Sequence, residues 1–187
     1  MLRALLLSAL AGMAVAANAH EPRVVAPGEG RTVEVPFHGT RLLLSDQMSE
    51  GSVSIYEFDL GPGTAGAPPH KHTHEDEYAY VLGGEISFMI GDNVVVAGPG
   101  TLAALTRGTP HGFWNAGEMP ARALFIVSEG RFERFFDAVA MGFREERPVS
   151  PDAANAMVGR IAAAHGITMR PDLIPPEAAR YFAPPAD

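Results

Sequence analysis

The sequence predicts an all-β protein, an antiparallel sandwich or barrel that is followed by covering helices. Three observations support this fold class. Between residues 24 and 127 the apolar residues fall in runs of strand length that are rich in Val, Ile, Phe and Tyr. Glycine, proline, asparagine and aspartate, the residues of tight turns, separate these runs at near-regular spacing. From residue 130 onward the apolar residues follow a helical period instead.

Nine short strands are predicted before the helical part. They cover residues 32–37, 41–44, 53–60, 78–82, 85–90, 93–97, 101–105, 111–115 and 121–127. Turn sequences such as Gly83-Gly84 and Gly98-Pro99-Gly100 lie between successive runs. Because no helical pattern lies between the strands, we expect them to pair antiparallel within one sandwich or barrel.

Alternation along the central strands predicts which side chains face the interior. These are Glu77, Ala79, Val81, Ile86, Phe88 and Ile90, whereas Tyr78, Tyr80, Ser87 and Met89 take the opposite face. Phe113 and Asn115 are expected on the same face as His111. Most of these residues should form a filled core, and the alternative is an apolar lining around a small ligand.

Two helices are predicted to cover the barrel. Phe132, Phe135, Phe136 and Val139 recur at the spacing of one helix face, which predicts an amphipathic helix near residues 131–141. A second helix is expected over residues 152–165, starting at Ser150-Pro151 and stopping at Gly166. The proline-rich end should follow the surface with one short helical turn at residues 177–181, and His165 is interpreted as a structural residue at a helix end.

The first nineteen residues have the pattern of a secretory signal peptide. Arg3 supplies a positive charge, residues 4–15 an apolar run too short to span a bilayer, and Ala17-Asn18-Ala19 a cleavage site of small residues. We therefore expect cleavage after Ala19, one domain over residues 20–187 with a helical extension from about 130, and a periplasmic or secreted location. A membrane anchor is the alternative.

Composition limits the classes of partner. The chain has a formal net charge of −8, which becomes −9 when Arg3 is removed, and this argues against nucleic acid or an anionic membrane as partner. It contains no cysteine, so no thiol serves as metal ligand or nucleophile. A small-molecule substrate is the expected partner.

Histidines and a glutamate are spaced as metal ligands. His70 and His72 lie two apart, so on an extended strand they share a face while Lys71 points away. Glu77 follows after an interval that allows the chain to turn and present a carboxylate oxygen to the same ion. His111 begins a later aromatic strand and is the expected third imidazole. The prediction is one divalent metal ion held by His70, His72, Glu77 and His111.

These residues resemble the two motifs of the cupin family. His70, His72, Glu77 and Gly84 fit the first motif, and the second is matched at Gly100, Gly108, His111 and Asn115. Thr106 stands where the second motif has proline, and the leading glycine of the first motif is displaced to Gly63. The resemblance implies a cupin-type double-stranded β-helix, or jelly roll, and a homodimer formed through barrel faces.

A third histidine makes the register of the first motif ambiguous. If His72 and His74 were the pair, Gly66 would take the leading position, but Tyr78 would stand where a glutamate is required. We therefore expect His70 and His72 to be the ligands, with His74 outside the metal site.

The resemblance to quercetin dioxygenases implies a metal-dependent dioxygenase that acts on a small aromatic or enolic, flavonol-like substrate. In that reading Glu77 is a ligand or a catalytic base, and Arg107 either pairs with an acidic substrate or is a solvated turn residue. Copper, iron, manganese, nickel, cobalt and zinc all remain open. The alternatives are a cupin decarboxylase, isomerase or lyase, and a non-catalytic periplasmic protein that binds a metal or a small molecule.

Overall fold

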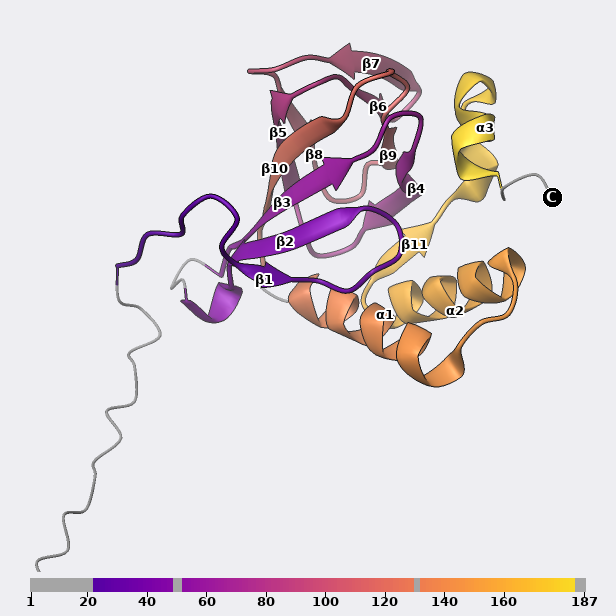
Figure 1. Cartoon of the computed structure of the whole chain (residues 1–187). Helices are drawn as coiled ribbons and strands as arrows, with labels where there is room; N and C mark the ends of the chain where they lie inside the picture. The colour runs from indigo at the N-terminus through magenta and orange to yellow at the C-terminus, as the bar shows by residue number, and fades with distance from the viewer. Residues whose placement is uncertain (1–21, 49–51, 130–131, 184–187) are drawn as a thin grey trace, which may run out of the picture.

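Two antiparallel sheets face each other in a double-stranded β-helix, with the two longer helices at one end (Figure 1). The computed structural model describes residues 22–48, 52–129 and 132–183. The predicted signal peptide and its cleavage site lie outside these residues. The predicted fold class, a jelly roll with helices after it, is confirmed.

The first sheet contains six strands and the second contains five. In the order in which they pair, the first sheet consists of β1 (Arg31–Thr32), β2 (Gly39–Leu44), β3 (Ser54–Leu60), β10 (Ala121–Val127), β5 (Glu77–Gly83) and β8 (Leu102–Leu105). The second consists of β11 (Ile167–Met169), β4 (Ala65–His72), β9 (His111–Trp114), β6 (Ile86–Ile90) and β7 (Asn93–Ala97).

Helices follow the strands, as predicted. They are α1 (Phe132–Glu146), α2 (Pro151–Ala164) and α3 (Ala179–Phe182), and short 3-10 helices occur at η1 (Asp46–Met48), η2 (Pro171–Leu173) and η3 (Pro176–Ala178). The Ser150 hydroxyl accepts a hydrogen bond from the Ala153 amide at 3.2 Å and so caps α2, while Gly166, at φ +76°, lies just after its end. No described helix is both long and apolar enough to cross a bilayer.

Three expectations about the strands need correction. The first predicted strand, residues 32–37, is reduced to β1, because the Val35 amide turns back to the Val33 carbonyl and Pro36 has no amide hydrogen to donate. The nine predicted strands left out residues 65–72, although His70 and His72 were expected on an extended strand, and these residues form β4. Strand β11 was not predicted, since three residues are too few to show a period, and it pairs with the end of β4.

The interior is packed with aromatic side chains. The Phe58 ring lies 4.3 Å from that of Phe125, and the Phe125 ring lies 4.9 Å from that of Phe113. The predicted interior residues Glu77, Ala79, Val81, Ile86 and Phe88 are buried, and Ile90 is partly buried against the same core. The inward-facing residues near the predicted metal site therefore mainly form a packed core, as expected for most of these residues.

The outer face of the second sheet is also covered. Met89 and Trp114 point away from the main core, yet both are buried, because they pack against Ala178 and the partly buried Tyr181 in the carboxy-terminal segment. The prediction that Phe88 and Met89 lie on opposite faces of the sheet is confirmed. Strand alternation could not indicate that the proline-rich carboxy-terminal segment would cover the face of Met89.

Candidate metal centre

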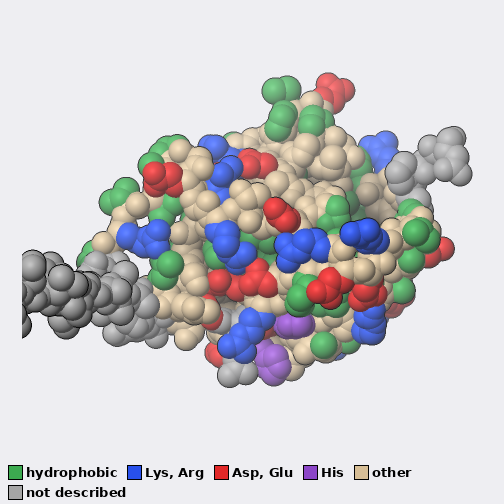
Figure 2. All heavy atoms as spheres, turned by 60° about the horizontal axis from the view of Figure 1, so that its bottom comes forward, with side chains coloured by type: hydrophobic (Ala, Val, Ile, Leu, Met, Phe, Trp, Pro, Cys, Tyr) green, Lys and Arg blue, Asp and Glu red, His purple; other side chains and the backbone are tan. Residues whose placement is uncertain are grey.

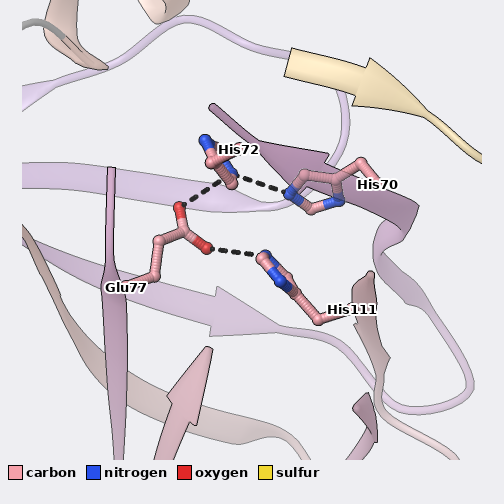
Figure 3. A group of neighbouring side chains, drawn as sticks. All are labelled: His70, His72, Glu77 and His111. Carbon is pink, nitrogen blue, oxygen red and sulfur yellow. Dashed lines mark hydrogen bonds and ion pairs between the residues drawn. The ribbon is translucent and has the colours of Figure 1, made fainter. Parts of the chain in front are cut away.

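The four predicted ligand residues meet at the end of the barrel that α1 and α2 cover (Figures 1 and 3). His70 and His72 lie at the end of β4, Glu77 begins β5 and His111 begins β9. The relative exposures of the four residues are 7%, 1%, 3% and 0%, in that order. A carboxylate and three imidazoles thus share one buried site, although they come from three separate strands.

The spacing of the donor atoms suits one ion. His70 Nε2 lies 3.0 Å from His72 Nε2, Glu77 Oε1 lies 3.6 Å from His72 Nε2, and Glu77 Oε2 lies 3.4 Å from His111 Nε2. All four donors lie within 4.8 Å of one another. Two donors bound at about 2.1 Å to one ion stand about 3 to 4 Å apart. The cluster therefore fits a single metal ion of ordinary size.

Each imidazole is oriented by an acceptor on its outer nitrogen. Nδ1 of His70 lies 2.8 Å from the Pro68 carbonyl, and Nδ1 of His111 lies 3.0 Å from the Thr109 carbonyl. Because a carbonyl only accepts hydrogen bonds, both rings carry hydrogen on Nδ1 and present a lone pair at Nε2 when neutral. This is the tautomer that a metal requires at Nε2.

Three buried nitrogen atoms of the cluster have the arrangement that a bound cation would satisfy. His111 Nε2 makes no hydrogen bond within the described part of the chain, although it is fully buried. His70 Nε2 and His72 Nε2 face each other at 3.0 Å, an arrangement that needs a proton or a cation between two lone pairs. The cluster thus has the chemistry of a cation site, and the residues present fit a divalent metal.

The charges of the cluster also favour a cation. Burial, together with the neighbouring His111 and His72, lowers the pKa of His70 to about 3, so this imidazole is neutral near pH 7. Burial opposes ionisation of Glu77, but the adjacent His72 and His111 imidazoles outweigh it and lower the pKa of Glu77 to about 2. Burial likewise disfavours charge on His72, yet the carboxylates of Glu77 and Glu75 raise its pKa. Glu77 is therefore an anion throughout the physiological pH range.

Glu75 belongs to the site, and the sequence analysis missed it. Its Oε2 lies 3.1 Å from His72 Nδ1, and the residue is only 3% exposed. A carboxylate behind a ligating imidazole fixes the ring and strengthens it as a ligand. The signal in the sequence was a glutamate three positions after His72. It was hidden because Glu75, Asp76 and Glu77 have the appearance of an ordinary polar loop.

Three other candidates lie outside the cluster. His74 is exposed on the loop after β4. Arg107 is held by Asp76, whose carboxylate accepts from Nε at 3.1 Å and from a terminal nitrogen at 2.8 Å, so it is a paired turn residue and not a free anion site. His165 Nδ1 lies 2.8 Å from the Ile161 carbonyl at the end of α2, as expected for a structural residue.

The second motif positions His111 through its turn. The Thr109 amide donates to the Thr106 carbonyl, Gly108 has a φ of +79°, and the Gly108 amide donates to the His72 carbonyl at 2.8 Å. This turn accommodates threonine in place of proline at position 106. Asn115 does not line the metal site, because its amide nitrogen donates to the carbonyls of Gly61 and Met119 and joins two loops.

Comparison with known proteins matches the central part of the chain to a family model. Residues 56–127 match the family model described as Cupin domain. The chain is similar in structure to the polyketide cyclase RemF from Streptomyces resistomycificus, with 24% sequence identity, coverage of 58% of this chain and 80% of that chain, and a TM-score of 0.50. No curated protein sequence matches the chain.

Two further solved structures resemble the chain. One is an uncharacterized conserved protein with a double-stranded β-helix domain from Klebsiella pneumoniae, at 21% identity, with 59% of this chain and 92% of that chain covered and a TM-score of 0.49. The other is a predicted oxalate decarboxylase from Thermotoga maritima, at 24% identity, with coverage of 49% and 79% and a TM-score of 0.45. At such identities the likeness concerns the fold alone.

The matched segment runs from β3 to the end of β10 and contains all four cluster residues. The helices and β11 lie beyond it. The family model, the two-sheet topology and the buried cluster together indicate a small single cupin domain that includes residues 56–127.

Proposed function

We propose that this protein is a metal-dependent cupin dioxygenase that acts on a small aromatic substrate with an enolic or phenolic hydroxyl. The observation that supports the proposal is the convergence of three imidazole nitrogens and one carboxylate in a buried site. Four donors do not fill the sphere of a six-coordinate ion, which leaves room for substrate or dioxygen. A divalent ion at this position supplies Lewis-acid polarisation of a bound hydroxyl and, if it is redox-active, the electron transfer that dioxygen chemistry needs.

The protein residues have separate tasks in this proposal. His70, His72 and His111 hold the ion through Nε2, with their outer nitrogens fixed as described above. Glu77 is the negative group nearest the reacting hydroxyl and is proposed to accept its proton on a carboxylate oxygen. Since its neighbours lower the pKa of Glu77, this carboxylate is a weak base, and a metal ion held by the three imidazoles would supply the acidity that the hydroxyl needs.

The substitution Glu77→Gln tests the base role. Glutamine keeps the size of the side chain but cannot take up a proton, so turnover should fall by roughly 100 to 10,000-fold while metal content falls less. The measurement is oxygen uptake with flavonols, catechols and diketones, together with elemental analysis of each preparation. Full turnover by a metal-loaded Glu77→Gln variant would contradict the base role.

One observation favours a second function. None of the four donor residues is more than 7% exposed, and low solvent access to the site would also suit a protein that holds a metal or a small molecule without turnover. A decarboxylase, isomerase or lyase would also use such a cluster, since this fold serves many reactions. Stoichiometric zinc and no oxygen uptake with iron, copper, manganese, nickel or cobalt loaded in turn would support the non-catalytic function.

We also propose that the protein acts outside the cytoplasm. The support is the charged start, apolar run and small-residue cleavage site within residues 1–19. The intact mass of protein recovered from the periplasm or medium tests this proposal. A mature chain that begins at His20 is the expected result, and one that still begins at Met1 would contradict it.

A further inference from the structure

A hollow of about 300 Å³ lies beside the cluster of four donor side chains. Its walls come from the loop after β4, the first turn of α1 and the junction between α2 and β11. The side chains that define it are His74, Glu75, Phe132, Arg134, Phe135 and His165. Two of these also contact His72 of the cluster: Glu75 through its hydrogen bond, and Phe132 through a ring whose centre lies 5.5 Å from the imidazole.

The fold builds this hollow through a glycine and a short strand. The Thr73 amide donates to the Gly166 carbonyl at 2.9 Å, and Ile167 of β11 pairs with His72 of β4. Gly166 has a φ of +76°, and a Cβ atom at this position would lie 2.8 Å from Cδ2 of His74. The absence of a side chain at Gly166 therefore lets the His74 ring lie against the backbone, beside the metal cluster.

The hollow contains an arginine without a partner. Arg134 makes no hydrogen bond or ion pair within residues 22–48, 52–129 and 132–183, whereas every other arginine in those ranges makes at least one. Arg134 is exposed, so its guanidinium is open to a ligand that enters from solvent. Figure 2 looks toward this end of the molecule and shows histidine side chains beside basic (Lys or Arg) and acidic side chains.

The other walls suit an aromatic ring. Phe132 and Phe135 both line the hollow, and the Phe135 ring lies 6.1 Å from the ring of His165. A planar guanidinium binds a carboxylate through two parallel hydrogen bonds, and the neighbouring imidazole of His74 can add a further donor. The inner carboxylate, Glu75, already accepts from His72, so it competes less for the guanidinium.

We propose that this hollow binds a small aromatic carboxylate, with the acid group on Arg134 between His74 and His165 and the ring against Phe132 and Phe135. The inference rests on the proposed function, because it identifies this acid as the substrate class of the adjoining metal centre. It also moves the anion-binding role from Arg107, which Asp76 occupies, to Arg134.

The test is a binding measurement that requires no turnover. Salicylate, which carries both a phenol and a carboxylate, is titrated into the metal-loaded protein, and salicylamide serves as the uncharged probe of similar shape. Ring resonances of His74 and His165 in nuclear magnetic resonance spectra should shift with salicylate. The substitution Arg134→Met should weaken salicylate binding by roughly ten-fold or more and leave salicylamide unchanged. Arg144→Met is the control, since Arg144 lies on the same helix but faces Glu34.

Three outcomes would overturn the proposal: no salicylate binding at millimolar concentration, equal binding by wild type and Arg134→Met, or equal loss of salicylate and salicylamide binding in Arg134→Met. The last would show that the substitution disturbs the hollow and does not remove a contact with the acid group. If salicylate binds through Arg134 in a protein that shows no oxygen uptake, the hollow is retained as a ligand site and the dioxygenase proposal fails.

Discussion

Each imidazole of the candidate metal centre has a hydrogen-bond partner at Nδ1, the nitrogen that faces away from the ion position, and this partner is in place without an ion. Two rings are held by backbone carbonyls and the third by the buried carboxylate of Glu75. A ring held in this way loses little further rotational freedom when it binds a metal, so the cluster is preorganised. The free energy of metal binding should therefore depend both on the four donors and on the groups that aim them.

Alanine substitutions at His70 and at His74 distinguish a metal-donor histidine from a nearby histidine that lies outside the cluster. His70→Ala removes one of four donors and should lower metal affinity by more than about 100-fold, whereas His74→Ala should leave affinity nearly unchanged because His74 lies outside the cluster. Competition with a chelator measures both. Equal loss of metal in the two variants would mean that the ligand pair is His72 and His74.

Glu75→Gln tests the carboxylate behind His72. The variant retains a hydrogen-bond acceptor but loses the negative charge that strengthens the imidazole, so metal affinity should fall by roughly 10 to 100-fold. Chelator competition is again the measurement, and Glu85→Gln, on the exposed surface, is the matched control. Unchanged affinity in Glu75→Gln would show that the contact with His72 contributes nothing to the site.

At the scale of elements, β11 and the turns position the ends of the strands that carry the cluster residues. Strand β11 pairs with β4 at His70 and His72, so the carboxy-terminal part of the chain supports the two histidines from outside the sheet edge. At the other end of β5, Gly84 adopts a φ of +67° and leads directly into β6. A change at this turn should disturb the sheet without touching a metal ligand.

Gly84→Ala should destabilise the fold, and Gly83→Ala should not. A Cβ atom at position 84 would lie 2.4 Å from the Pro120 carbonyl oxygen and would also have to adopt a left-handed conformation, whereas one at position 83 meets nothing within 4 Å. We expect the free energy of unfolding to fall by about 2 kcal/mol or more for Gly84→Ala and by less than about 1 kcal/mol for Gly83→Ala. Urea denaturation followed by circular dichroism measures both, and equal midpoints would contradict the assignment.

At the scale of the whole molecule, the edge of the second sheet is apolar. Val94, Val95 and Val96 on β7 are 40%, 50% and 62% exposed, and β7 pairs only with β6 among the described strands. The strand from Asn93 to Ala97 contains no charged residue and no proline, the usual protections of an edge. A second copy of β7, antiparallel about Val95, would complete the backbone hydrogen bonds with two-fold symmetry.

We therefore expect the predicted homodimer to form along β7. Val95→Lys should reduce the mass measured by light scattering from that of a dimer to that of a monomer, because a buried lysine would face its own symmetry copy. Val149→Lys is the control, since Val149 is 98% exposed and lies between α1 and α2, away from the sheet edge. A monomeric mass for the wild-type protein would show that the dimer prediction is wrong.

Local patterns in the sequence determined most of the strands, the two longer helices and the four residues of the cluster. Alternation and turn residues are properties of neighbouring residues, and the spacing of His70, His72 and Glu77 follows directly from strand geometry. Ser150 and Gly166 marked the limits of α2 for the same reason.

Only the tertiary structure decided which distant groups meet. The contact of Glu75 with His72 depends on how the loop after β4 folds inward, and the pairing of β11 with β4 joins segments almost a hundred residues apart in the chain. The same holds for the two arginines: Arg107 forms an ion pair with Asp76, whereas Arg134 lines the hollow beside the cluster. Such partners are set by packing between segments, and a single sequence carries no local period that records them.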